Sequence, residues 1–274
     1  MSTILVHLLI LWGVIAVVLG VILTIHRRGR PLAGLRYAGI FGFVGAAFGV
    51  IIGMTTFFAS QHYSSMQQAA EREATALGDV AALSGAFPHR EGDALRAQLY
   101  CYATDVINDE WRRNSDRGSP AVEGRERAVY ALLLQVGRLN PKPYNWYTTA
   151  LSTSLTVGEQ RQDRLLESSP QIPVPLWILL YAGAAIIVVF AFFFHLEGRG
   201  QLVGMNIAVF LMLTAVVAVL AGLDSPTEAP FGQSPDAMKA ERALLAKDLP
   251  PPARDAKPFC ASLPVPAGEP AALL

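Results

Sequence analysis

The chain has 274 residues, of which 52% are hydrophobic and only 16% are charged. Soluble domains carry about 25% charged residues, so this composition excludes an ordinary water-soluble chain and indicates a membrane protein. The 22 basic and 22 acidic residues cancel, and overall charge therefore predicts no nucleic-acid partner.

Four long apolar runs predict membrane-spanning helices. They cover residues 8–25, 37–60, 176–195 and 202–223, and none of them contains Asp, Glu, Lys or Arg. A helix needs about 20 apolar residues to cross about 30 Å of hydrocarbon. Each run is apolar on all sides, whereas a helix on a soluble core is apolar along one stripe. We therefore predict an all-α integral membrane protein, with helix pairs in segments 1–60 and 174–223.

The short loop after the first run indicates the orientation. It carries Arg27, Arg28, Arg30 and Arg36 and no acidic residue. Arginine in short loops is typical of the cytoplasmic side. We expect both termini and the central segment to be extracytoplasmic, although the opposite arrangement stays open. The first run has no basic residues before it, so we expect a retained anchor rather than a cleaved signal. Scarce lysine fits a GC-rich bacterial genome, and we expect the bacterial inner (cytoplasmic) membrane.

Glycines recur along the second run, where Gly45, Gly49 and Gly53 are spaced by four residues. Small residues on one helix face allow close backbone approach in lipid. The face could pack against another span of the chain, or form a subunit interface or pore lining. Asn206 in the fourth run is a second polar or pore candidate, more typical of a bond to a neighbouring helix. The absence of charged residues within the runs disfavours a proton-driven pump.

The central segment, residues 61–173, is predicted to form a water-soluble helical bundle. Leu95, Leu99, Tyr102 and Val106 recur at spacings of one helical turn, and similar patterns precede and follow them. We expect three or four antiparallel helices. Glycine and proline are absent between the end of the second run and Gly78, so one helix can continue from the bilayer into the bundle.

Charged residues just beyond the second run have two interpretations. Glu71 and Glu73 flank Arg72. Such a cluster usually forms a solvated face, which we expect here, and a permeation vestibule is the alternative.

The tail, residues 224–274, is proline-rich. We expect a short helix near residues 235–247 and a largely disordered chain beyond about residue 249, where little can be buried. Cys101 lies in a predicted helix and Cys260 in this tail. The two could form a disulfide in an oxidising compartment, but we expect unpaired thiols.

Catalytic and metal-binding motifs are not apparent. The sequence contains no phosphate-binding glycine loop, no serine nucleophile elbow and no His-Glu-x-x-His or Cys-x-x-Cys motif. His62 and His89 have no carboxylate or cysteine at ligand spacing. We therefore expect no enzyme activity, cofactor or metal, and no small-molecule substrate is identified.

Several short motifs, taken in order, resemble the bacterial bestrophin-like domain family of unknown function. They are Leu95 with Arg96, the stretch from Val106 to Trp111, Arg164, Pro173, Leu176 with Trp177, and the stretches 224–226 and 230–232. An insertion at residues 227–229 spreads the last motif. The resemblance spans about residues 36–239 and implies an oligomeric, channel-like membrane protein. It also singles out the bundle residues Arg96, Glu110, Trp111 and Arg164.

Two functions therefore stand. The first is a homo-oligomeric ion channel or channel-like protein. The second is a non-conducting membrane scaffold or envelope-stress component whose bundle binds a partner.

The Glu110 carboxylate needs an oppositely charged side chain from another helix, and Arg164 is a candidate. Membrane lipid and further copies of the chain are the expected partners.

Overall fold

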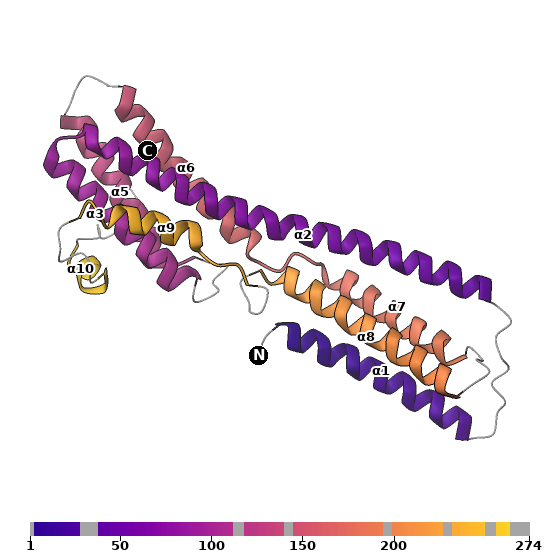
Figure 1. Cartoon of the computed structure of the whole chain (residues 1–274). Helices are drawn as coiled ribbons and strands as arrows, with labels where there is room; N and C mark the ends of the chain where they lie inside the picture. Colours follow the sequence, from indigo (N-terminus) through magenta and orange to yellow (C-terminus); the bar gives the residue numbers. More distant parts are fainter. Residues whose placement is uncertain are drawn as a thin grey trace. The chain divides into compact units, whose positions relative to one another are not determined.

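The computed structural model describes residues 3–27, 38–111, 118–139, 145–193, 199–226, 232–249 and 256–263. These residues form helices and no strand, which confirms the predicted all-α class (Figure 1). The chain divides into two compact units. Met1–Tyr63 with Pro170–Gly232 forms the membrane unit, and Ser64–Ser169 with Gln233–Leu274 forms the bundle unit.

Four helices supply the membrane spans. They are α1 (Thr3–Arg27), α2 (Ala38–Leu83), α7 (Val174–Phe193) and α8 (Arg199–Asp224). Each contains a stretch long and apolar enough to cross a membrane. Large apolar side chains such as Phe43 and Val174 are 76% and 70% exposed in the single chain, which suits lipid as the solvent. The protein is a multi-pass membrane protein, as predicted.

Within the membrane unit, α1, α7 and α8 pack against one another. Leu11, Leu180 and Leu220, one from each helix, are almost completely buried at their contact. The membrane part of α2 joins the same core through Phe48. The Phe48 ring occupies the space where a side chain on Gly183 of α7 would stand, so any larger residue at that position would require the ring to move.

A buried carboxylate ties two of the spans together. Asp224, the last residue of α8, accepts hydrogen bonds from the backbone N–H groups of Gln171 and Ile172, both at 2.8 Å. These two residues lead into α7. Asp224 belongs to the closing motif of the family resemblance, and the structure gives that motif a physical role.

Helix α2 is a single helix of 46 residues that contributes to both units. Its sequence explains the length, because glycine and proline are absent between Gly53 and Gly78. The helix ends at Leu83, where a short 3₁₀ turn, η1 (Ser84–Ala86), precedes Pro88.

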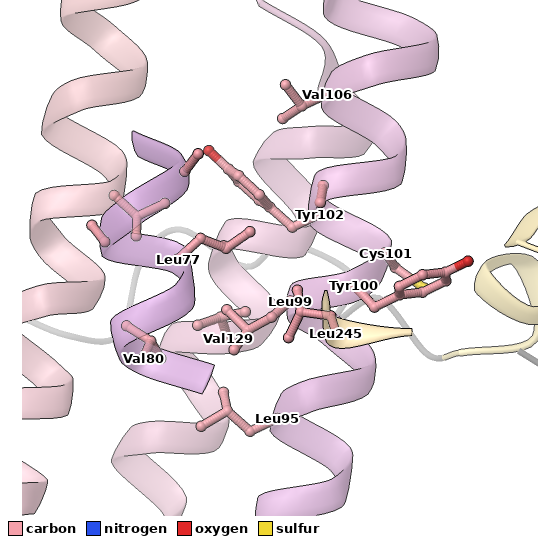
Figure 2. Packing of buried hydrophobic residues seen from close by; sticks show 14 of the residues in the cluster. Leu77, Val80, Leu95, Leu99, Tyr100, Cys101, Tyr102, Val106, Val129 and Leu245 are labelled. Atoms are coloured by element: carbon pink, nitrogen blue, oxygen red, sulfur yellow. The ribbon is translucent and has the colours of Figure 1, made fainter. Parts of the chain in front are cut away.

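The bundle unit consists of the end of α2 together with later helices of the chain. These are α3 (His89–Asp105), the π turn η2 (Val106–Glu110), α5 (Pro120–Leu139), α6 (Asn145–Glu167), α9 (Asp236–Leu245) and α10 (Ala256–Ser262). Figure 2 shows its apolar core, with Leu77 and Val80 of α2 beside Leu99 and Tyr102 of α3. All four side chains are at most 1% exposed, in agreement with the predicted helical periodicity.

The tail differs from the sequence-based expectation in two respects. The stretch beyond residue 249 was expected to be disordered, but it contains α10, and Phe259 packs edge-on against Tyr100 at 6.1 Å between ring centroids. The thiols were expected to be unpaired, but Cys101 and Cys260 form a disulfide with their Cα atoms 5.4 Å apart. Arg125 also donates a hydrogen bond to the Cys260 carbonyl at 2.5 Å. The expectation of unpaired thiols was wrong because the partner of each cysteine is distant in sequence. The expectation of a largely disordered stretch beyond residue 249 concerns mostly residues outside the described ones, 250–255 and 264–274.

Breaking the disulfide should destabilise the bundle unit. The bond joins residues 159 positions apart, and such cross-links typically contribute about 2–4 kcal/mol by restricting the unfolded chain. Cys260→Ser should therefore lower the melting temperature of the purified protein in detergent, and Cys101→Ser should lower it equally. Ser262→Ala, on the exposed side of the same short helix, is the matched control. An unchanged melting temperature in both cysteine variants, or free thiols in unreduced denatured protein, would contradict the prediction.

Candidate functional site

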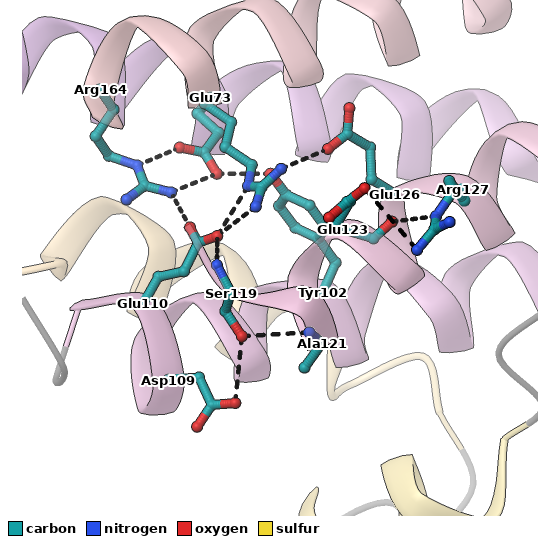
Figure 3. A network of polar contacts seen from close by, with 11 residues as sticks. Glu73, Tyr102, Asp109, Glu110, Ser119, Ala121, Glu123, Glu126, Arg127 and Arg164 are labelled. Atoms are coloured by element: carbon teal, nitrogen blue, oxygen red, sulfur yellow. Dashed lines mark hydrogen bonds and ion pairs between the residues drawn. The ribbon is translucent and has the colours of Figure 1, made fainter. Parts of the chain in front are cut away.

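Four charged side chains meet inside the bundle unit. Glu73 comes from α2, Glu110 from the end of η2, and Arg161 and Arg164 lie one turn apart on α6 (Figure 3). The two carboxylate side chains are fully buried, and the arginine side chains are 9% and 3% exposed. Burying a charge is costly unless it is paired and hydrogen-bonded, so the pairing decides whether the bundle can fold.

Arg164 connects the two carboxylates. Its Nε donates to Oε2 of Glu73 at 2.6 Å, and its Nη2 donates to Oε2 of Glu110 at 2.8 Å. The guanidinium also lies over the Trp111 ring, 5.3 Å from the centroid, a cation–π geometry. The Trp111 Nε1 in turn donates to the Gln233 carbonyl at 2.9 Å. Burial alone would lower the pKa of Arg164, but Glu73 and Glu110 outweigh it and raise that pKa, so the group stays charged.

Arg161 connects Glu110 with a third carboxylate. Its Nε and Nη2 donate to Oε1 of Glu110 at 3.0 and 2.5 Å, and its Nη1 donates to Oε2 of Glu126 on α5 at 2.9 Å. The backbone N–H of Ser119 adds a bond to Oε1 of Glu110 at 2.9 Å. Burial favours protonation of Glu110, but the bonds and charges of Arg161 and Arg164 outweigh it and lower its pKa.

Tyr102 completes the coordination of Glu73. Its hydroxyl donates to Oε1 of Glu73 at 2.8 Å from a position that is 1% exposed. Burial, together with the charge of Glu73, raises the pKa of Tyr102 well above its ordinary value. The phenol therefore remains a protonated donor, and the Glu73 carboxylate receives bonds from two different helices.

The cluster carries an excess of negative charge. Three carboxylates, Glu73, Glu110 and Glu126, face two guanidinium groups. Glu126 is the most accessible, with 33% of its side chain exposed. Its burial outweighs the attraction of Arg161 and raises its pKa. In the part of the chain that the structure describes, no three His, Cys, Asp or Glu residues lie close enough together to hold a metal ion.

The structure brings together three of the four bundle residues singled out by resemblance. Glu110, Trp111 and Arg164 share one site, and the expected pairing of Glu110 with Arg164 is present at 2.8 Å. Arg96 instead pairs with Asp93, three residues earlier on α3, at 3.5 Å.

Sequence reasoning misplaced one member of the cluster and missed another. Glu73 was expected on a solvated face because charges surround it in sequence, yet it is completely buried. It falls on the apolar face formed by Met66, Ala69, Leu77 and Val80. Arg161 similarly follows Val157 by four residues on the buried face of α6. A charge on an apolar face was the available signal in both cases.

The three glycine candidates of α2 do not contact another span in the described part of the chain. A side chain at Gly45, Gly49 or Gly53 would meet no atom within 4 Å in the described structure. The buried residues of the same stretch are Phe48, Thr55 and Ala59, which lie on a different side of α2. Asn206 is half-buried on α8 and makes a contact there.

Comparison with known proteins identifies the family. A model of the Bestrophin-like domain matches residues 8–237. Two variants of a bacterial bestrophin homologue from Klebsiella pneumoniae match in structure, with TM-scores of 0.67 and 0.65, identities of 10% and 11%, and coverage of 90% of this chain and 98% of theirs. A structure described as a membrane protein matches with a TM-score of 0.65 and 9% identity, over 95% of this chain and 100% of its own. No curated protein matches. The structural matches establish a shared fold, and the chain belongs to the Bestrophin-like domain family.

Removing the carboxylate at the centre of the cluster should destabilise the bundle strongly. Glu110→Ala leaves Arg164 paired with Glu73 alone and Arg161 paired with Glu126 alone. It removes the carboxylate that joins the two guanidinium groups, and breaking a buried ion pair in this way costs about 3–5 kcal/mol. We expect a clear fall in the melting temperature in detergent. Glu123→Ala is the control, because Glu123 pairs with Arg127 at 3.9 Å where both side chains are about half exposed, and such pairs contribute about 1 kcal/mol or less. Equal melting temperatures for the two variants would contradict a structural role for the cluster.

Proposed function

We propose that this Bestrophin-like protein is a homo-oligomeric ion channel or channel-like protein of a bacterial inner membrane. The glycine face of α2, defined by Gly45, Gly49 and Gly53, meets further copies of the chain beside a conducting path. The proposal rests on one observation: this face has no neighbour within 4 Å in the described part of a single chain.

The packing of the other spans supports this assignment. Helices α1, α7 and α8 bury their contact residues against one another, whereas α2 joins them mainly through Phe48. Membrane helices associate where small residues let backbones approach, because lipid offers no hydrophobic driving force between apolar helices. A row of three glycines without a partner in its own chain is therefore suited to contact with a second subunit.

The chemistry of the spans favours passive conduction. The four apolar runs contain no Asp, Glu, Lys or Arg, and such groups are the usual carriers in proton-coupled transport. We accordingly assign no catalytic or ion-coupling residue, and ion selectivity would come from backbone and small polar groups along the path.

Ion flux tests the proposal. Protein reconstituted into liposomes should release trapped chloride or potassium down a gradient, measured with ion-sensitive electrodes. Gly49→Leu should change that flux several-fold, because four additional carbon atoms enter the glycine face. Gly20→Leu in α1 is the matched control, since a side chain at Gly20 also meets nothing within 4 Å. Absence of flux under both gradients would reject the channel and favour the non-conducting scaffold.

We also propose that the bundle unit is extracytoplasmic. The disulfide between Cys101 and Cys260 supports this orientation, because disulfides persist in oxidising compartments and are rare in the cytosol. The arginine-rich loop that begins at Arg27 independently favours a cytoplasmic position for the connection between the first two spans. Two unrelated properties of the chain thus favour the same arrangement.

Reporter fusions test the orientation. Alkaline phosphatase fused after Leu274 should be active in bacterial cells, because the enzyme needs an oxidising compartment to fold. The same reporter inserted after Arg30, between the first two spans, should be inactive. The reverse pattern of activities would place the bundle unit in the cytoplasm.

A further inference from the structure

A cavity of about 570 Å³ opens between α5 and α6 in the bundle unit. Leu77, Leu99 and Tyr102 form part of its floor, and Val129 and Leu155 form part of its walls. Figure 2 shows the floor residues together in the bundle core. The volume lies within the range of roughly 300–1,000 Å³ typical of small-molecule sites, and a mainly apolar lining is also typical of such sites.

One carboxylate in the lining has an unused acceptor. Oε2 of Glu126 accepts from Arg161 at 2.9 Å, whereas Oε1 accepts no hydrogen bond from any described residue (Figure 3). Oε1 points toward Gly158 of α6, where a side-chain Cβ would stand only 2.5 Å away. The glycine therefore leaves room for the free oxygen at the junction of the two helices.

The charge around the cavity favours a cation. Glu126 belongs to a cluster with one more carboxylate than guanidinium, and Glu159 adds a second carboxylate to the lining. Arg127 also lines the cavity, but its guanidinium is shared with Glu123 outside the lining. An anion would meet two carboxylates, whereas a cation would offset the excess negative charge. The Tyr130 ring, also in the lining, offers an aromatic face to a cation.

We propose that this cavity binds a small amphipathic cation. Its ammonium group pairs with Oε1 of Glu126, and its apolar body lies against Leu134 and Leu155, the more accessible leucines of the lining. Such a site goes beyond the proposed conduction and does not depend on it, because the cavity lies wholly within the bundle unit of one chain.

The test uses three probes of similar shape and different charge: 2-phenylethylammonium, 2-phenylethanol and 3-phenylpropanoate. Binding to the full chain in detergent is followed by saturation-transfer NMR and titration. We expect saturable binding of the ammonium probe and at least tenfold weaker binding of the other two. Glu126→Gln should weaken binding of the cation at least tenfold, because it removes the charge and keeps the shape. Asp163→Asn, an exposed carboxylate of α6 outside the lining, should leave the affinity within twofold.

A second variant tests whether the ligand occupies the cavity itself, without changing the charge of Glu126. Ala131→Trp places a large ring in the lining and leaves Glu126 in place, so it should also abolish cation binding while the melting temperature is maintained. Equal binding of the neutral probe, equal binding to Glu126→Gln, or no binding of any probe would overturn the proposal. Loss of self-association in Ala131→Trp without cation binding in the parent would assign the cavity to a second copy and also overturn it. Because no flux is measured, these outcomes are independent of the channel test.

Discussion

The bundle unit depends on a set of buried carboxylates and guanidinium groups that pair with one another. Glu110 accepts hydrogen bonds from both Arg161 and Arg164 of α6, and Arg164 also donates a hydrogen bond to Glu73. Each of these ion pairs joins elements that are distant in sequence, so the cluster can form only when α2, η2 and α6 are all in place. Apolar packing tolerates small displacements, whereas a buried ion pair with several bonds demands one geometry. The cluster therefore specifies this arrangement of helices in addition to stabilising it.

The π turn explains how one helix serves both a core and this cluster. Leu95, Leu99, Tyr102 and Val106 direct an apolar face into the bundle over about three turns. The wider turn over Val106–Glu110 changes the angle of the residues that follow, and π turns are frequent at functional sites for this reason. Glu110, at the end of this turn, and Trp111, which follows it, both contact Arg164.

Sequence reasoning succeeded where the solvent imposes a pattern. Lipid requires long uncharged runs, and these located all four spans. Water on one side requires periodic burial, and this located the core face of α3. Sequence reasoning failed where the interacting residue is distant in sequence. The charges beside Glu73 suggested a solvated surface because Arg164, its partner, lies 91 residues away. The bond between Cys101 and Cys260 was considered but not predicted, since neither local propensity nor periodicity encodes a contact across 159 residues. The pairing of Glu110 with Arg164 was anticipated through the order of family motifs.

Asp224 has a consequence for how the third and fourth spans of this chain are joined. Asp224 accepts hydrogen bonds from two backbone N–H groups that precede Pro173 and lie outside any helix, so these groups have no helical carbonyl as a partner. The carboxylate of Asp224, in the last turn of α8, thus connects the end of α8 to the segment that leads into α7. The three-residue insertion at 227–229 falls after this point in the sequence. The two bonds by which Asp224 joins the ends of α7 and α8 therefore include no residue of that insertion.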